Sequence, residues 1–459
     1  MSEFRFELRR YELDSSLEPH ALLAGCTARA PLLLDSAGGD PARFSLLAFD
    51  PLASLELPLA RAGAGAWRAE LAALLARARL ERADESLPFA GGFLGALAYD
   101  LGVEGERLAL PAEPWGFPLL AGGLYCDFLW RDEHSGRSEL VLADGALDGR
   151  ASVDVRRAAA LAWIERARRA RPGAIRATGP LVRHTSAEEH ARRIERCREF
   201  IAQGECYQAN LAHRFTRPLV GSPRDLYARL RAANRAPYMG YVEGAWGALL
   251  SASPELLLDC ANGAARTRPI KGTLPRLADP SADAEQRARL LASEKDRAEL
   301  AMIVDLERND LGRVAEWGSV RVEGFPSLKS YARVHHLMAD VVARPRAGAS
   351  ALDVLAALFP GGSITGAPKL RSMELVAELE REGRGFFCGA LGLLDLRDRA
   401  LFNILIRSPL WRARPELGAG AGEVSFRVGG GITWASAARA EDDETLAKAL
   451  SLAEALEPD

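Results

Sequence analysis

A chain of 459 residues is long enough for two or three folding units, or for one large body of mixed helices and strands. Hydrophobic residues make up 48% and charged residues 26%, and the 59 basic and 62 acidic side chains leave a net charge of -3. This composition excludes intrinsic disorder and a role that depends on nucleic-acid phosphates. No apolar run approaches the ~18 residues of a membrane helix, and the charged N-terminal segment is unlike a secretory signal. We therefore expect a cytoplasmic protein without a nucleic-acid or membrane partner.

The six cysteines are predicted to be reduced and mostly buried. None belongs to a CxxC pair, so a structural zinc site is not expected. None lies in the tight glycine turn that holds the nucleophile of a glutamine amidotransferase. The chain is therefore not expected to release ammonia from glutamine by itself.

The first 175 residues are predicted to mix strands and helices. Short apolar runs bounded by glycine and proline predict strands at 31–36, 44–49, 53–59 and 123–130. Leucines and alanines at helical spacing predict helices over 67–83 and 154–173. The basic, proline-containing stretch 166–180 is the best linker candidate. We therefore predict one unit over 1–175 and a second over 176–459.

The second unit is predicted to contain clustered strands with helices at irregular intervals. Helices are expected over 186–205, 284–307, 368–381 and 443–457, the first with a capping box at Ser186 and Glu189. Strands are expected over 206–219, 247–260, 265–276, 321–344, 386–396, 400–411 and 423–435. This irregular order favours an α+β fold over a strict βαβ repeat.

Two pairs of carboxylates are spaced three residues apart on predicted helices. Asp296 and Glu299 form one pair, and Glu441 and Glu444 form the other. Residues at this spacing share one helix face. If the two pairs faced each other they would repel without a cation, and an oxygen-rich site of this kind suits Mg²⁺. Each pair alone is more typical of a solvated helix face, so the surrounding motifs must decide.

Two glycine-rich segments and one lysine complete the candidate chemistry. The segment 360–369 lacks the Lys-Ser/Thr ending of a P-loop, but it precedes a helix whose first turn can offer N–H groups to an anion. Together with Arg407, the run Gly429–Gly431 is a candidate cradle for a carboxylate. Lys271 in RPIKGT is one of only five lysines, and a lysine of lowered pKa is a good nucleophile. An exposed turn is the alternative interpretation of this peptide.

These segments together resemble the chorismate-utilising enzyme family. The motifs run in that family's order from about residue 205 to residue 448, and they include YQANL, SPELLL, RPIKGT, DLERNDLGR, GGSITGAPK, NILIRS and GGGITW. The resemblance implies an α+β fold like that of anthranilate synthase component I, with β-sheets packed face to face and helices around them. It makes 1–175 the N-terminal region of that fold and 176–459 the chorismate-binding catalytic region.

Two positions distinguish branches within the family. Members that add water to chorismate have a lysine base where this chain has Gln208. Members that form anthranilate typically have alanine where this chain has Lys271, and the lysine is typical of the branch that forms 4-amino-4-deoxychorismate for para-aminobenzoate and folate synthesis. The resemblance therefore implies amino transfer to chorismate, with ammonia from a separate glutamine amidotransferase subunit.

The resemblance also implies roles for individual residues. Lys271 would add to the ring of chorismate while Glu255 protonates the leaving C4 hydroxyl, and ammonia would then attack C4 and expel the lysine. Glu299 and Glu444 would hold Mg²⁺, with Glu441 and Asp296 close by. The implied substrate-binding residues are Gln208, His336, Thr365, Gly366, Lys369, Arg407, Gly429, Gly430, Gly431 and Lys448.

Other functions remain open at this point. One is anthranilate formation with loss of pyruvate, which Lys271 argues against. Another is a chorismate-binding subunit without turnover, which the retained carboxylates and Lys271 argue against. Isochorismate or salicylate formation is disfavoured by Gln208. The segment 32–36 resembles part of the tryptophan pocket of anthranilate synthases, and tryptophan binding also stays open.

Overall fold

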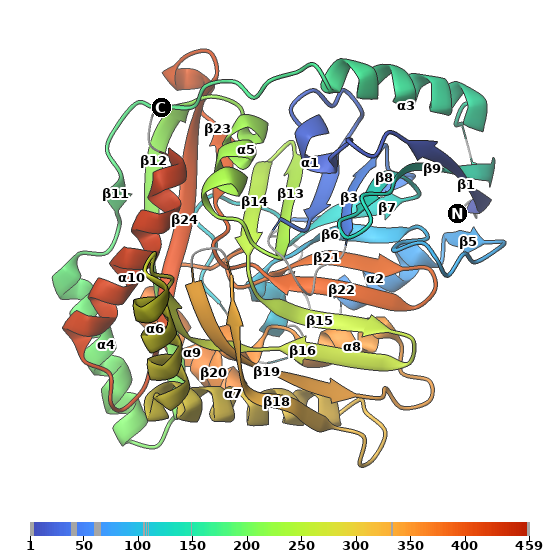
Figure 1. Ribbon diagram of the computed structural model, residues 1–459. Coiled ribbons are helices and arrows are strands. Elements are labelled where there is room, and N and C mark those ends of the chain that lie inside the picture. Colours follow the sequence, from blue (N-terminus) through green and yellow to red (C-terminus); the bar gives the residue numbers. More distant parts are fainter. Residues whose placement is uncertain are drawn as a thin grey trace.

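The computed structural model describes residues 4–37, 44–58, 66–103, 106, 108, 110–147, 149–331 and 334–456. Within these ranges every named strand belongs to one of two large sheets, with helices around them (Figure 1). The predicted α+β class is confirmed. Two ends of predicted elements, Leu59 and Glu457, lie outside the described residues.

The larger sheet has fourteen strands in the described part of the chain. Its order is β10, β12, β24, β23, β14, β13, β2, β3, β8, β9, β1 and β5, with β11 and β20 joined to β12. The β1–β5 pair is parallel and the other described pairs are antiparallel. Its strands are β1 (Phe4–Leu13), β2 (Leu32–Asp35), β3 (Phe44–Phe49), β5 (Ala78–Leu80), β8 (Asp127–Asp132), β9 (Ser138–Ala146), β10 (Arg176–Ala177), β11 (Val182–Arg183), β12 (Gln208–Val220), β13 (Tyr238–Gly244), β14 (Gly247–Ser253), β20 (Gly366–Ala367), β23 (Leu410–Ala413) and β24 (Ala421–Ile432).

The smaller sheet has ten strands among the described residues, in the order β17, β19, β16, β15, β22, β21, β6, β7 and β4, with β18 joined to β19. They are β4 (Ala53–Leu57), β6 (Gly92–Leu97), β7 (Leu120–Tyr125), β15 (Leu256–Ala261), β16 (Ala264–Arg268), β17 (Ile270–Pro275), β18 (Arg321–Ser330), β19 (Val334–Ala343), β21 (Ala390–Asp395) and β22 (Arg399–Ile404). Both sheets combine strands from before and after residue 175. The division into two units at that residue stays a prediction.

The helices lie on the outside of the sheets (Figure 1). They are α1 (Pro19–Leu22), α2 (Ala66–Leu75), α3 (Val153–Ala167), α4 (Ala187–Ala202), α5 (Pro223–Ala233), α6 (Pro280–Ala292), α7 (Glu294–Gly312), α8 (Ala351–Leu358), α9 (Lys369–Glu380) and α10 (Ala438–Ala453). In Figure 1, α4 and α10 run along β12 and β24 at the left of the view. A search of the described helices finds none with the length and apolar character needed to span a bilayer.

The larger sheet is buried on both faces, because residues of its central strands alternate between two hydrophobic clusters. Leu32 and Leu34 of β2 belong to a cluster shared with the smaller sheet, which contributes Phe93 and Leu391. Leu33, between them, belongs to a second cluster that α3, α5 and α10 cover. The sheets therefore pack face to face through the first cluster, as predicted.

Three predicted helices differ from the structure, and the one predicted over 154–173 ends at Ala167. The helix predicted over 284–307 is divided into α6 and α7 at Ser293, which has extended backbone angles and whose hydroxyl accepts from the N–H of Asp296 at 3.2 Å. The helix predicted over 67–83 ends at Leu75, because residues 78–80 pair with β1 as a strand. The capping box at Ser186 is half formed, since the Glu189 carboxylate binds arginines of the next turn instead.

Two predicted strands cross from one sheet to the other. The segment 247–260 leaves the larger sheet after β14 and enters the smaller one as β15, so Pro254 and Glu255 lie at the crossing. The segment 400–411 makes the reverse passage from β22 to β23, with Arg407 at its crossing. Strand periodicity continues through both segments, so the sequence pattern does not reveal the change of sheet.

Candidate active site

Lys271 lies among the residues that the sequence predicts for the site. It stands on β17, an edge strand of the smaller sheet, and its Nζ is 3.4 Å from the carbonyl oxygen of Ser363. A Cβ atom built on Gly431 of β24 would also lie 3.4 Å from this Nζ, so the two sheets approach each other here. Burial lowers the pKa of Lys271 below its usual 10.5, although Glu299 and Glu255 oppose the shift. This setting favours the neutral, nucleophilic amine.

Glu255 and Arg407 are held together by the two sheet crossings. The N–H of Ile404 donates to the Glu255 carbonyl at 3.0 Å, and the N–H of Ala252 donates to the Arg407 carbonyl at 3.1 Å. Arg407 has a φ of +51°, an uncommon value for a residue other than glycine. The backbone therefore fixes an acid and a guanidinium at neighbouring points.

The electrostatics of this pair suit an acid and an anion-binding group. Burial raises the pKa of Glu255, although the Ser363 hydroxyl, Lys271 and Arg407 oppose the shift. Its Oε1 accepts from the N–H of Ile270 at 3.2 Å. The Arg407 guanidinium makes no hydrogen bond or ion pair with a described residue. A buried carboxyl of raised pKa is suited to donate a proton, and an unpaired guanidinium is suited to bind a carboxylate.

Two further buried side chains keep polar atoms without a partner among the described residues. Both amide atoms of Gln208 are buried and unbonded, and a Cβ on Gly431 would lie 2.4 Å from its Nε2. His336 bonds through Nδ1 to the Thr273 hydroxyl at 2.8 Å, while its Nε2 has no partner. Burial lowers the pKa of His336 to about 3, so the ring is neutral. Because unpaired buried polar atoms are costly, these atoms mark a place where a ligand completes the bonding.

The glycine run lies inside β24 rather than in a turn after it. The strand pairs with β12 along its length, but with β23 only from Gly422 to Ser425. The Gly429 carbonyl accepts from Lys448 Nζ at 2.9 Å, so the peptide groups of this residue face away from β12, and those of Gly431 share that direction. No described strand covers this edge. Gly429 and Gly431 therefore present backbone N–H groups to the site, as expected for an anion cradle.

The four predicted metal carboxylates lie in the first two turns of α7 and α10. Lys295 Nζ is 3.9 Å from Glu299 Oε1 and 3.9 Å from Glu441 Oε1, so the two helices present carboxylates to one cation. Glu444 Oε1 lies 2.7 Å from Lys448 Nζ. The Asp296 carboxyl carbon would be 2.9 Å from a Cβ on Gly272, so Asp296 packs against β17. The structure therefore brings all four residues to the end of the site that carries Lys271.

The pKa values on this side are set by burial and by lysines. Burial raises the pKa of Glu299, and the charges of Lys271 and Lys295 oppose the shift. Burial also acts to raise the pKa of Glu444. The nearby lysines, of which Lys448 has the largest effect, outweigh burial, so the pKa of Glu444 is lowered. The carboxylates are thus compensated by protein cations.

Three predicted substrate-binding residues are engaged within the protein. Lys369 Nζ lies 2.6 Å from Asp310 Oδ2 and 2.9 Å from the Leu358 carbonyl. The Thr365 hydroxyl donates to the Gly361 carbonyl at 3.0 Å. Gly366 has a φ of +144°, and a Cβ there would meet the Gln208 carbonyl at 2.1 Å. These contacts shape the loop beside Lys271, and direct contact with substrate stays a prediction for all three.

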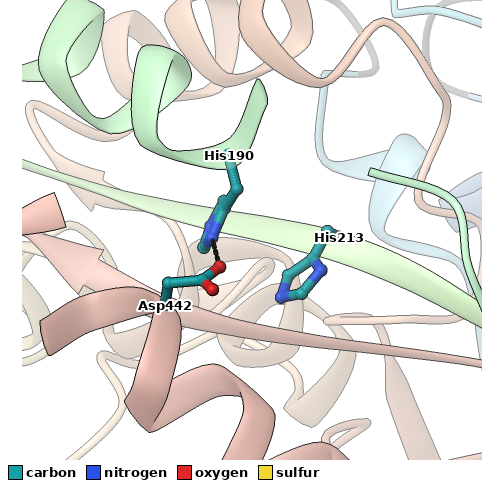
Figure 2. Close-up of side chains that lie close together, drawn as sticks. All are labelled: His190, His213 and Asp442. Carbon is teal, nitrogen blue, oxygen red and sulfur yellow. Dashed lines mark hydrogen bonds and ion pairs between the residues drawn. The ribbon is translucent and has the colours of Figure 1, made fainter. Parts of the chain in front are cut away.

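A buried group of His190, His213 and Asp442 lies beside α10 (Figure 2). In the part of the chain that the structure describes, it is the one set of three or more His, Cys, Asp or Glu ligand atoms within 4.8 Å of one another. The imidazole rings are stacked, with centroids 4.4 Å and planes 29° apart, so their lone pairs do not converge. Asp442 Oδ1 lies 2.6 Å from His190 Nδ1 and the same carboxylate pairs with Arg183. We interpret the group as a polar clamp that ties α10 to α4 and β12.

Three residues that contact or orient the predicted site residues were not predicted from the sequence. Ser363 supplies the carbonyl near Lys271, Thr273 orients His336, and Lys295 stands between the carboxylates of α7 and α10. Ser363 lies in the glycine-rich segment and Thr273 in the RPIKGT motif, so both were within predicted motifs. The scarcity of lysine was the available signal for Lys295.

Comparison with known proteins gives one family. The family of chorismate binding enzymes matches residues 30–454. Aminodeoxychorismate synthase component 1 of Klebsiella aerogenes is 41% identical over 79% of this chain and 76% of its own length. The protein of that name from Escherichia coli is 38% identical over 82% of this chain and 81% of its own. An anthranilate synthase component 1 of Haloarcula marismortui is 37% identical over 84% of this chain and 76% of its own length.

Solved structures agree on the fold. Anthranilate synthase component I from Streptococcus pneumoniae superposes with a TM-score of 0.76 at 27% identity, covering 90% of this chain and 93% of that one. The menaquinone-specific isochorismate synthase of Escherichia coli gives a TM-score of 0.75 at 19% identity, over 99% and 96% of the two chains. Enzymes with different products thus share this architecture, so the residues of the site must distinguish among them.

Proposed function

The chain belongs to the family of chorismate binding enzymes, and we propose that it is an aminodeoxychorismate synthase component 1. It converts chorismate and ammonia to 4-amino-4-deoxychorismate. Two of the relatives described above carry that name, at 41% and 38% identity. The alternative, anthranilate formation, is the activity named for a relative at 37% identity. Sequence identity to relatives therefore does not distinguish the two reactions. The distinction must come from a residue of the site.

The observation that carries the proposal is the setting of Lys271. Its amine faces Gly431, lies near the Ser363 carbonyl and has a lowered pKa because of burial. The lowered pKa favours the neutral amine, and a neutral amine in this position can attack an electrophilic ring carbon. An enzyme that only eliminates pyruvate from an aminated ring has no use for a second nucleophile there.

The proposed reaction proceeds in two displacements. The Lys271 amine forms a bond to C2 of the ring, both ring double bonds shift by one position, and the C4 hydroxyl leaves as water with a proton from Glu255. Ammonia then forms a bond to C4, both double bonds shift back, and the lysine amine leaves. The net change is chorismate plus ammonia to aminodeoxychorismate plus water. Splitting one difficult displacement into two is the gain from the covalent step.

The strand residues would bind the substrate during both steps. The unpaired Arg407 guanidinium and the N–H groups of Gly429 and Gly431 suit the enolpyruvyl carboxylate. The orphaned amide of Gln208 and the Nε2 of His336 offer hydrogen bonds to other oxygens. Burial raises the pKa of Glu255, which favours the protonated carboxyl as the donor to the departing hydroxyl.

The carboxylates of α7 and α10 suit Mg²⁺. They offer only oxygen ligands from two facing helices, and a protein cation, Lys295, already stands between Glu299 and Glu441. Glu299 and Glu444 would hold the ion, with Glu441 and Asp296 close by. When bound, the ion would neutralise a ring carboxylate of the substrate.

The ammonia would come from a separate glutamine amidotransferase subunit. The relatives are named as component 1, which implies another component. All six cysteines are free and buried, as predicted, which leaves none exposed as a nucleophile for glutamine. Reduced thiols also support a cytoplasmic location.

A product assay on the purified full chain tests the proposal. Chorismate, MgCl₂ and ammonium are supplied at alkaline pH, and products are identified by mass and absorbance with a separate assay for pyruvate. Aminodeoxychorismate without pyruvate is the expected result. Anthranilate with an equal amount of pyruvate would contradict the proposal and assign the chain to the anthranilate-forming branch. Omission of ammonium is the control.

A further inference from the structure

Lys295 occupies an unusual position for a lysine. It is the second residue of α7, where a positive charge opposes the helix dipole. Its ammonium nevertheless lies 3.9 Å from a carboxylate oxygen of Glu299 on the same helix and 3.9 Å from one of Glu441 on α10. It is also one of only five lysines in a chain with 59 basic residues. Helix stability therefore does not explain a lysine at this position, whereas an attraction to the two carboxylates does.

The geometry is that of a cation shared by two anions. The Glu299 and Glu441 side chains are 16% and 7% exposed, so their mutual repulsion is poorly screened by water. The Lys295 side chain is 58% exposed, and at 3.9 Å it forms no close hydrogen bond with either carboxylate. The ammonium can therefore move into solvent on its flexible stem without any loss of core packing.

We propose that Lys295 is an internal competitor of the divalent metal ion for Glu299 and Glu441. The inference rests on the proposed function, because it takes these carboxylates as part of an Mg²⁺ site. The ammonium holds α7 and α10 together against the repulsion of their carboxylates. Mg²⁺ displaces it toward solvent, so the affinity for Mg²⁺ is lower than the carboxylates alone would give. Lys295 thereby restricts tight metal binding to the complex in which the dianionic substrate adds its own charge.

The test is a titration of the full chain with MgCl₂ by calorimetry, repeated with Mn²⁺ as a paramagnetic probe of free ion. Lys295→Met removes the charge and keeps the length of the side chain. Arg297→Met is the matched control, since it changes the net charge equally at an exposed position two residues along α7. Lys295→Arg keeps the charge. Lys295→Met is expected to bind Mg²⁺ at least about threefold more tightly than the wild type, with Arg297→Met unchanged.

Thermal unfolding in EDTA gives a second readout. In EDTA, the Lys295→Met protein is expected to unfold at a lower temperature than the wild type. Mg²⁺ is expected to raise its unfolding temperature back to that of the wild type, because the metal replaces the missing cation. Lys295→Gln repeats the measurement if the methionine variant folds poorly.

The outcomes separate the two proposals. If the wild type binds Mg²⁺ but neither neutral variant binds it more tightly, Lys295 is not a competitor, and the proposed function is unaffected. If Arg297→Met tightens binding equally, the effect is one of net charge, and the inference also fails. If the wild type binds neither Mg²⁺ nor Mn²⁺, with and without chorismate, the metal site itself is wrong and the inference fails with it, while the product assay still decides the proposed reaction.

Discussion

The strand side and the helix side of the active site hold their charges in opposite ways. The strand side comprises Gln208, Glu255, Lys271, His336, Arg407 and Gly431, and the helix side comprises Asp296, Glu299, Glu441 and Glu444 with Lys295 and Lys448. On the strand side, the Arg407 guanidinium and the Gln208 amide make no hydrogen bond with a described residue, and backbone hydrogen bonds fix the positions of Glu255 and Arg407. On the helix side, lysines already compensate the carboxylates.

This difference separates two tasks. A rigid set of unpaired groups is prepared for a substrate, because it needs no rearrangement when the ligand arrives. A set of compensated charges on exposed stems must exchange partners when a metal ion binds. Substitutions on the strand side should therefore lower turnover at every Mg²⁺ concentration. Substitutions on the helix side should lower turnover at low Mg²⁺, and added Mg²⁺ should restore it.

The largest effect is expected for Lys271→Ala. Loss of the nucleophile should reduce aminodeoxychorismate formation by more than the ~10²–10⁴-fold typical of removing a proton donor. The measurement is kcat with saturating ammonium and Mg²⁺, with Lys271→Arg as a second variant that keeps a long basic side chain but not the nucleophilic amine. Turnover within a few-fold of the wild type would remove the covalent step.

Glu255→Gln should cost about 10²–10⁴-fold in kcat, because the leaving hydroxyl loses its acid. The reaction needs the protonated carboxyl, and burial raises the pKa of Glu255, so the wild-type rate should persist above the usual range of glutamate and decline as pH rises through the raised pKa. The variant should lack this decline. An identical pH profile for kcat in both proteins would exclude Glu255 as the acid.

Glu299→Gln should raise the Mg²⁺ concentration needed for half-maximal activity by at least about 10- to 100-fold, the range seen when a metal site loses a group that only supports a ligand. Most of the activity should return at high Mg²⁺. Glu294→Gln, an exposed carboxylate of the same helix, serves as control. A loss that Mg²⁺ does not restore would place Glu299 on the substrate rather than on the metal.

The smallest expected effect is a difference in KM for chorismate between alanine substitutions at two neighbouring glycines. A Cβ at Gly431 would lie 2.4 Å from Gln208 Nε2, whereas a Cβ at Gly430 would meet only the Glu441 carboxylate, at 3.3 Å. Gly431→Ala should therefore raise KM for chorismate about tenfold, by displacing a rigid group. Gly430→Ala should change KM much less, because the glutamate end can move. Equal effects would contradict the contrast between the two sides.

Much of the helix side could be predicted from the sequence. The i, i+3 spacing of its carboxylates is a local property of helices, so Asp296 with Glu299 and Glu441 with Glu444 were assigned to common faces. The facing of the two helices depends on the break at Ser293 and on the packing of α10. Both are tertiary features, and the continuous helical pattern of 284–307 concealed the break.

The strand side was harder to predict. Glu255 and Arg407 owe their proximity to two crossings between sheets, which strand periodicity does not signal. The roles of these residues came from the family resemblance instead. Lys369 illustrates the same limit, because its ion pair with Asp310 joins α9 to the far end of α7, a contact that no local pattern encodes.

The most direct test of the central claim is a mass measurement on the enzyme with chorismate and Mg²⁺ but without ammonium. The account predicts a covalent adduct with the mass of chorismate less one water, on the peptide that contains Lys271, and its disappearance when ammonium is added. Unmodified protein at every time point, together with anthranilate and pyruvate once ammonium is present, would contradict it.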